Sequence, residues 1–241
     1  MKTIYHAADS RGDANHGWLK SRHTFSFANY HNPERMGFGA LRVINDDFVI
    51  GGQGFGKHSH RDMEIISIPL SGKLGHGDNI GNIGNIGNNG IIETGEIQVM
   101  SAGTGITHSE MNGDDKEDVK FLQIWVIPNK MNVEPRYQQV RMDEIMQPNE
   151  FNQVLSPNAD DAGVWIHQNA WFSMGDFDKN VTQTYELKDP NNGVYIFVIS
   201  GKVVVNDNTL NTRDGLGIWD TKNFTMDVID DAKVLLMEVP M

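Results

Sequence analysis

Two stretches of the sequence decide the fold: GGQGFGKHSH at residues 51–60 and GTGITHSE at residues 103–110. Side chains alternate between the two faces of a β-strand, so residues two apart lie on the same face. The glycines that open each stretch allow tight turns of the backbone. Each stretch therefore predicts a strand that presents two potential metal ligands on one face. The pairs are His58 with His60, and His108 with Glu110.

Together the two pairs offer three imidazoles and one carboxylate. If the strands face each other across a barrel, these groups converge within the roughly 2.0–2.2 Å ligand distances of a divalent transition metal. The sequence contains no cysteine, so a metal here has only His, Asp and Glu side chains to bind it. Such spacings arise often by chance, so the metal hypothesis depends on both pairs together.

Short apolar alternations run through the rest of the chain, cut by Gly, Asn and Asp, and they predict many short strands. The predicted strands are residues 40–44, 48–50, 64–70, 96–100, 121–127, 181–187, 193–199, 202–205, 215–219, 224–228 and 234–239. Helix is expected only at 142–147, ended by Pro148, and around Trp18. The pattern indicates an antiparallel all-β protein.

A weak internal echo divides the chain into two similar units. Residues 68–73 and 198–202 each end in Ser-Gly-Lys after an apolar strand. We expect an amino-terminal metal-binding barrel at 1–130, a polar linker at 131–160 and a second barrel at 161–241. The only histidine after His108 is His167, so the second barrel is expected to lack a metal site.

Composition narrows the function classes. The 241 residues include 20 basic and 32 acidic side chains, a formal net charge of −12. Such a surface argues against direct nucleic-acid binding and against phosphorylated substrates. There is no secretory signal pattern and no apolar run of membrane-spanning length, so we expect a cytoplasmic protein without a membrane partner.

Several other features carry weaker expectations. His16 and His23 are expected to tie the amino terminus to the barrel, and His76 to be a satisfied surface histidine, although it could also line the pocket. Phe55 lies among the glycines before His58 and is the aromatic side chain most worth following. The Asn-Ile-Gly repeat at 79–90 predicts an extended hairpin loop. With the segment 1–30, it is a candidate rim for the site.

The spacing of glycines and ligands resembles the two signature motifs of the cupin superfamily. More specifically, five stretches resemble the pirin family in its bacterial branch: HGWL at 16–19, HTFSF at 23–27, MGFGALRVIN at 36–45, DMEI at 62–65 and MSAGTGITHSE at 100–110. The resemblance covers residues 11–127. It implies a bicupin fold of two antiparallel β-barrels, a metal held by His58, His60, His108 and Glu110, and quercetin 2,3-dioxygenase activity.

The carboxylate ligand has an alternative. Many cupins use the position of Glu64 as the fourth ligand, whereas the pirin resemblance implies Glu110. Both carboxylates lie at even spacing from a ligand histidine, so spacing does not decide between them. With Glu110 as ligand, we expect Glu64 to orient a ligand ring.

Three functions follow from this reading. The first is an oxygenase that uses O2 to open the heterocycle of a small aromatic enol such as a flavonol, with Glu110 as ligand and proton acceptor. Its metal is expected to be Fe(II), with Ni, Mn, Cu or Zn as alternatives. The second is a non-enzymatic, metal-dependent binding module that recognises a protein partner. The third is a metallo-cupin acting on an unrelated small enol or sugar.

Overall fold

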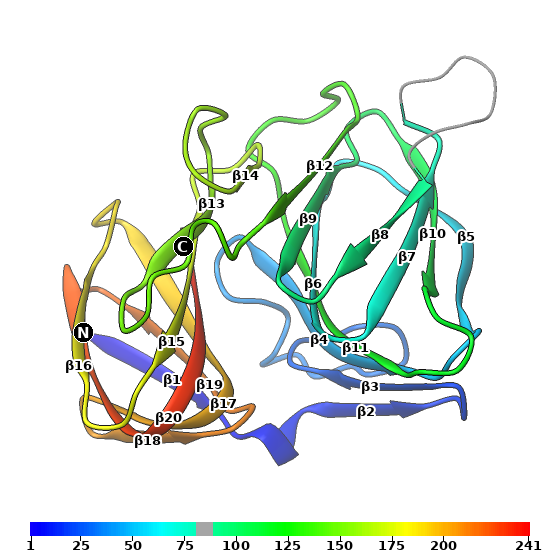
Figure 1. Cartoon of the computed structure of the whole chain (residues 1–241). Helices are drawn as coiled ribbons and strands as arrows, with labels where there is room; N and C mark the ends of the chain where they lie inside the picture. Colours follow the sequence, from blue (N-terminus) through cyan, green and yellow to red (C-terminus); the bar gives the residue numbers. More distant parts are fainter. Residues whose placement is uncertain (81–88) are drawn as a thin grey trace.

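A computed structural model of the chain describes residues 1–80 and 89–241. These residues form three β-sheets and a single helical turn, the 3-10 helix Ala8–Ser10. The sheets make two barrels that lie side by side, one built mainly from the first half of the chain and one mainly from the second (Figure 1). The prediction of an all-β fold with two barrels is confirmed. The part of the chain described contains no helix with the length and apolar character needed to cross a bilayer.

The first barrel consists of two sheets that face each other. The smaller sheet has the order β5 (Gly54–His60), β10 (Ile106–Asn112), β7 (Lys73–Asp78) and β8 (Asn89–Glu93). The larger sheet has the order β12 (Arg136–Arg141), β9 (Glu96–Ser101), β6 (Glu64–Ser71), β11 (Val119–Val126), β4 (Leu41–Val49), β3 (Leu19–His23) and β2 (Gly12–Asn15).

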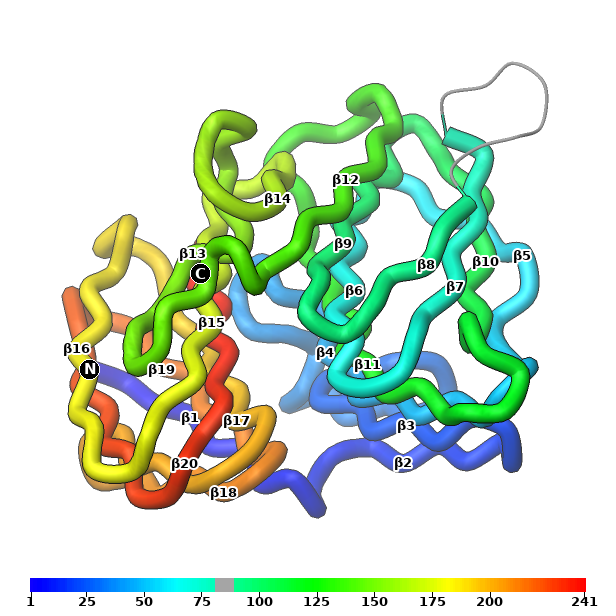
Figure 2. The backbone as a smooth tube through the Cα atoms, viewed as in Figure 1, coloured from blue at the N-terminus to red at the C-terminus, as the bar shows by residue number. Residues whose placement is uncertain are grey.

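The second barrel is one curled sheet. Its order is β1 (Lys2–His6), β19 (Gly215–Trp219), β17 (Asn192–Val205), β20 (Asn223–Pro240), β15 (Trp171–Phe177), β13 (Asn152–Ser156) and β14 (Val164–Trp165). β16 (Thr182–Glu186) pairs with β20, and β18 (Asn208–Asn211) pairs with β17. The pairing of β17 with β20 shifts register between Val198 and Val203. Such bulges bend strands, and the two long strands curve visibly in the tube drawing (Figure 2).

The repeated Ser-Gly-Lys sequence has one explanation in both barrels: the backbone turn at its glycine requires that residue. Gly72 and Gly201 have φ angles of +77° and +88°. A Cβ atom would lie 2.5 Å from the Asp118 carbonyl oxygen at Gly72, and 2.1 Å from that of Asp231 at Gly201. Only glycine combines this conformation with so close an approach.

The core between the barrels explains why some strands are apolar on both faces. Along β6, Ile65 lines the lumen of the first barrel, whereas Ile66 and Ile68 pack in one cluster with Phe172 and Met237 of the second. The run at 64–70 is therefore buried on both sides. The second lumen is filled by apolar side chains, among them Val194, Ile196, Leu216, Phe224 and Leu236.

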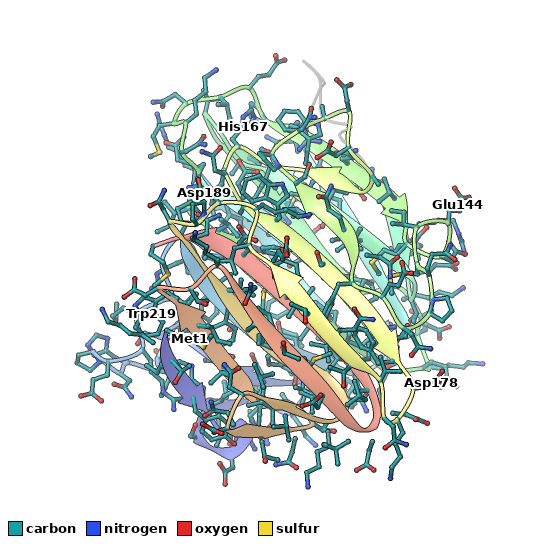
Figure 3. The ribbon with its side chains drawn as sticks, turned by 90° about the vertical axis from the view of Figure 1, so that its left-hand side faces the viewer. Met1, Glu144, His167, Asp178, Asp189 and Trp219 are labelled. Atoms are coloured by element: carbon teal, nitrogen blue, oxygen red, sulfur yellow. The ribbon has the colours of Figure 1, made fainter. Side chains whose placement is uncertain are left out.

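The first strand of the chain lies outside the unit expected for it. β1 pairs with β19, from Lys2 opposite Trp219 to His6 opposite Gly215, and therefore belongs to the second barrel. Met1 and Trp219 lie on the same side of that barrel (Figure 3). Four of the five β1 side chains are exposed, so no apolar pattern marks the strand in the sequence.

The expected linker contains two strands. β12 pairs along its whole length with β9 of the first barrel, and β13 joins the second. Every β12 side chain is half-buried or exposed, so its sequence reads as polar linker. The remaining boundaries of the division 1–130, 131–160 and 161–241 stay a prediction.

Both predicted helices are wrong. At 142–147 the chain makes one turn, with Met142 accepting backbone hydrogen bonds from Ile145 and Met146 at 2.9 and 2.8 Å. Trp18 lies in the turn between β2 and β3, where His16 N–H donates to the Leu19 carbonyl at 2.9 Å. Of the repeat at 79–90, residues 81–88 lie outside the described residues; the flanking strands β7 and β8 pair antiparallel.

The buried histidine His6 should make the stability of the folded protein depend on pH. His6 Nδ1 lies 2.8 Å from the Tyr195 hydroxyl, and burial, with Arg35, lowers the pKa of His6 from 6.5 to about 4. Between these values the unfolded chain binds a proton that the folded chain does not, so stability falls as the pH falls through this window. His6→Gln should remove this contribution, which amounts to up to about 3 kcal/mol of the change in the free energy of unfolding with pH.

Urea unfolding of both proteins in the same metal state, at about pH 7 and about pH 4.5, measures the effect. Groups that titrate in both proteins contribute equally and drop out of the comparison. Parallel pH profiles for the two proteins would contradict this account of His6.

Candidate metal centre

The pairing of β5 with β10 brings the two sequence pairs together. His58 lies directly opposite His108, and His60 opposite Ile106. Burial along β10 alternates, so His108 and Glu110 both point inward. Within the described residues, ligand atoms of His58, His60 and His108 lie within 4.8 Å of one another. Their ring centroids are 4.3 to 4.9 Å apart.

The electrostatics of this histidine triad suit metal binding. Burial, and then the neighbouring imidazoles, lower the pKa of His108 to about 2. Burial, with His58, lowers the pKa of His60 to about 4. Both rings are therefore neutral near pH 7, which is the state that binds a metal.

Hydrogen bonding also leaves ring nitrogens available. His58 Nδ1 lies 2.8 Å from the Gly56 carbonyl oxygen, which can only accept, so Nδ1 carries the proton and Nε2 keeps its lone pair. Both ring nitrogens of buried His108 lack a hydrogen-bond partner among the described residues. An unpaired buried imidazole needs an explanation, and a divalent ion bound by the triad supplies one.

Glu110 is buried two residues beyond His108, after a register shift in the β5–β10 pair. Gln123 Nε2 donates to both carboxylate oxygens at 2.8 Å, and Ser67 Oγ donates to Oε1 at 3.1 Å. The carboxylate lines the same cavity as the triad but is not in the group within 4.8 Å. The structure brings together three of the four expected ligands, and Glu110 as the fourth stays a prediction.

Glu64 does not orient a ligand ring. Asp62, with a φ of +48°, interrupts the chain between β5 and β6, so even spacing from His60 does not carry over to Glu64. Its side chain shares the face of Ile66, away from the lumen, and accepts a 2.6 Å hydrogen bond from Ser101. Burial raises the pKa of Glu64 to about 7, with Arg136 and Ser101 opposing the rise. The expected contact with a metal-site histidine is wrong.

His76 is buried beside the triad and is not a surface histidine. It lies opposite Glu110 in the β10–β7 pair, and its ring centroid is 5.7 Å from that of His108. Its Nε2 lies 2.7 Å from Asp78 Oδ2, with both side chains fully buried. The one-residue spacing of His76 and Asp78 repeats that of the other two pairs. That spacing is the signal that sequence reasoning missed.

A cavity of about 370 Å³ opens onto the triad, a volume in the range of small-molecule sites. His16, His23 and Phe55 all line it, so the two lead-segment histidines are nearer the site than expected. Residues 13–30 supply part of the lining, whereas β1 lies in the other barrel. Trp125 also lines the cavity. The centroid of its ring lies 4.9 Å from that of His60 and 5.3 Å from that of Phe27.

Comparison with known families agrees with this geometry. The family model described as Pirin matches residues 5–126, more than half of the chain. The chain belongs to the pirin family. A second model, described as Quercetinase C-terminal cupin domain, matches residues 153–239 of this pirin-family chain.

Several relatives match nearly the whole pirin-family chain. The quercetin 2,3-dioxygenase of Escherichia coli (strain K12) is 42% identical over 233 residues, which cover 97% of this chain and 96% of the relative. A pirin-like protein of Caulobacter vibrioides is 38% identical over 231 residues, covering 95% and 96%. The crystal structure of the bacterial pirin YhhW from Escherichia coli in complex with nickel(II) superposes with a TM-score of 0.91, at 41% identity and 99% coverage of both chains.

These comparisons confirm the pirin resemblance and the bicupin fold. The prediction of an enzyme similar to quercetin 2,3-dioxygenases is confirmed by the curated relatives. The triad and the nickel(II)-bound pirin confirm the prediction of a divalent metal site. The identity of the metal, the fourth ligand and the cytoplasmic location stay predictions.

Proposed function

We propose that this protein is a metal-dependent dioxygenase that uses O2 to open the heterocycle of a flavonol such as quercetin. In this proposal His58, His60 and His108 hold the metal with Glu110, and Fe(II) is the first metal to test. The observation that carries the proposal is the convergence of three imidazoles on one cavity. The relative of Escherichia coli named quercetin 2,3-dioxygenase, 42% identical, supports the substrate class.

The protein's own residues have distinct roles in this reaction. A bound divalent metal would acidify the enol hydroxyl of the substrate and support electron transfer to O2. Glu110 accepts the enol proton at a carboxylate oxygen, and Gln123 holds that carboxylate in place through two hydrogen bonds of 2.8 Å. Phe27, Phe55 and Trp125 give the cavity aromatic faces that exclude water around a planar substrate.

Reconstitution tests the proposal. The metal-free protein is loaded separately with Fe(II), Ni(II), Mn(II), Cu(II) or Zn(II), and quercetin is added. O2 uptake and loss of flavonol absorbance are then followed. With at least one metal, turnover should exceed that of His58→Ala by at least about tenfold, since this variant lacks one of the three imidazoles.

Turnover no higher than that of His58→Ala with every metal would refute the dioxygenase. The metal-dependent binding module would then be tested by comparing the proteins captured by the ferrous and ferric forms. Identical sets would count against that alternative too.

A further inference from the structure

A row of buried polar side chains lies across the cavity from the histidine triad. It belongs to the larger sheet of the first barrel, whereas the triad belongs to the smaller one. We call this row the polar wall, and its members are Ser21, His23, Asn45, Asp47 and Gln123. All five line the cavity, and each is at most 6% exposed.

Strand register places the wall's members next to one another. Ser21 on β3 lies opposite Asp47 on β4, and His23 lies opposite Asn45. Asn45 in turn lies opposite Gln123 on β11. The wall is therefore a continuous feature of three adjacent strands, positioned by their backbone pairing.

Four members of the wall have a buried polar atom without a hydrogen-bond partner among the described residues, whereas the Ser21 hydroxyl bonds to Asp47. The four atoms are His23 Nδ1, Asn45 Oδ1, Asp47 Oδ1 and Gln123 Oε1. Folded proteins rarely leave buried polar atoms unpaired, because each costs free energy. Four such atoms facing one cavity indicate groups kept for a ligand. The two amide oxygens only accept, and the ionised form of Asp47 also accepts, so the matching ligand groups are donors.

We infer that the polar wall is a subsite that binds hydroxyl groups of an aromatic substrate at the end that faces the larger sheet. The inference deepens the proposed function and rests on it for the aromatic class of the ligand. It predicts that ligands carrying hydroxyl donors at that end are selected over ligands that lack them. Unpaired buried acceptors reject the ligand that leaves them unsatisfied.

The charge state of Asp47 agrees with this role. Burial raises the pKa of Asp47 to about 7, with the charges of Glu110 and Asp46 adding to the rise and Ser21 opposing it. Near neutral pH the carboxyl group therefore exists in both forms. It accepts a hydrogen bond from a phenol in either form.

Ligand binding without turnover tests the wall. In the absence of O2, quenching of tryptophan fluorescence gives the Kd of the metal-loaded protein for three flavonols. They are quercetin, its analogue without hydroxyls on the pendant ring, and its analogue without hydroxyls on the fused ring apart from the enol. The variants are Asp47→Leu and Asn45→Leu, which remove the acceptors and keep a side chain branched at Cγ, and Ser21→Ala, which changes the volume least.

We expect the variants to weaken quercetin binding by about 10-fold to 100-fold. For the analogue that lacks the hydroxyls bound by the wall, the variants should change Kd by less than about threefold, because the lost contact is already absent. Ser101→Ala is the matched control. Ser101 is a buried serine of the same sheet that bonds Glu64 on the opposite face, and its loss should leave all three Kd values unchanged.

Three results would overturn the inference: quercetin Kd values within twofold of wild type in all folded variants, an equal loss for quercetin and both analogues, or no quercetin binding by the wild-type protein. Metal content and melting temperature identify variants that do not fold, and Ser21→Ala keeps the test decisive if a leucine variant is lost. Hydroxyl-dependent binding without O2 uptake would refute the dioxygenase and leave the wall standing. Turnover of quercetin, together with Kd values that the wall variants leave unchanged, would refute the wall and leave the dioxygenase standing.

Discussion

His108→Ala is expected to lower the metal content of the purified protein to well below one ion per chain and to abolish metal-dependent turnover. His108 is the most enclosed member of the triad, and its ring lies within 4.9 Å of both other rings. Without it, two half-buried imidazoles and a carboxylate held by Gln123 remain. We expect metal affinity to fall by at least about 100-fold, more than the loss typical of a residue that only supports a ligand.

Element analysis of protein purified without added metal measures the effect. His31→Ala is a suitable control, because His31 is an exposed histidine that does not line the cavity. It should retain the metal content of the wild-type protein. Full occupancy in His108→Ala would contradict the placement of the metal between β5 and β10.

Glu110→Gln is expected to lower turnover at saturating metal by about 10²-fold to 10⁴-fold, the usual contribution of a positioned proton acceptor. Glutamine retains the shape of Glu110 and can offer a ligand oxygen, but its amide does not take up the enol proton. It also replaces the carboxylate to which Gln123 and Ser67 donate. The three histidines should still bind metal when it is supplied in excess.

Glu64→Gln makes the same chemical change in a buried carboxylate on the opposite face of the sheet, where Glu64 accepts a hydrogen bond from Ser101. It should leave turnover within about twofold of the wild-type rate, because Glu64 contacts neither the triad nor the cavity. Equal effects of the two substitutions, or an unchanged rate in Glu110→Gln, would show that Glu110 is not the proton acceptor.

Sequence reasoning succeeded where a local rule connects spacing to geometry. His58 with His60, and His108 with Glu110, share a strand face because side chains alternate. Gly72 and Gly201 mark matching turns because both need a positive φ. The same rule failed for Glu64: Asp62 adopts a positive φ between the strands, and the alternation restarts at β6. Even spacing therefore predicts a shared face only along an uninterrupted strand.

Two edge strands with few buried side chains left no apolar pattern that sequence analysis could detect. β1 (Lys2–His6) has mostly exposed side chains, and β12 (Arg136–Arg141) only half-buried or exposed ones, yet each completes the edge of a sheet. The segment 142–147 shows the opposite case: its sequence resembles a helix, but the chain makes only one turn there.

The sequence by itself determined that the chain is an all-β protein with two barrels and that each pair of potential ligands shares one strand face, because periodicity and spacing are local properties of a strand. The tertiary structure alone decided which carboxylate faces the site, that His76 and Asp78 lie beside His108, and that the polar wall faces the triad. These relations depend on register between strands far apart in the chain. Which strands pair, and in which register, depends on packing across the lumen and between the barrels, and the spacing of residues within one strand does not specify the partner strand.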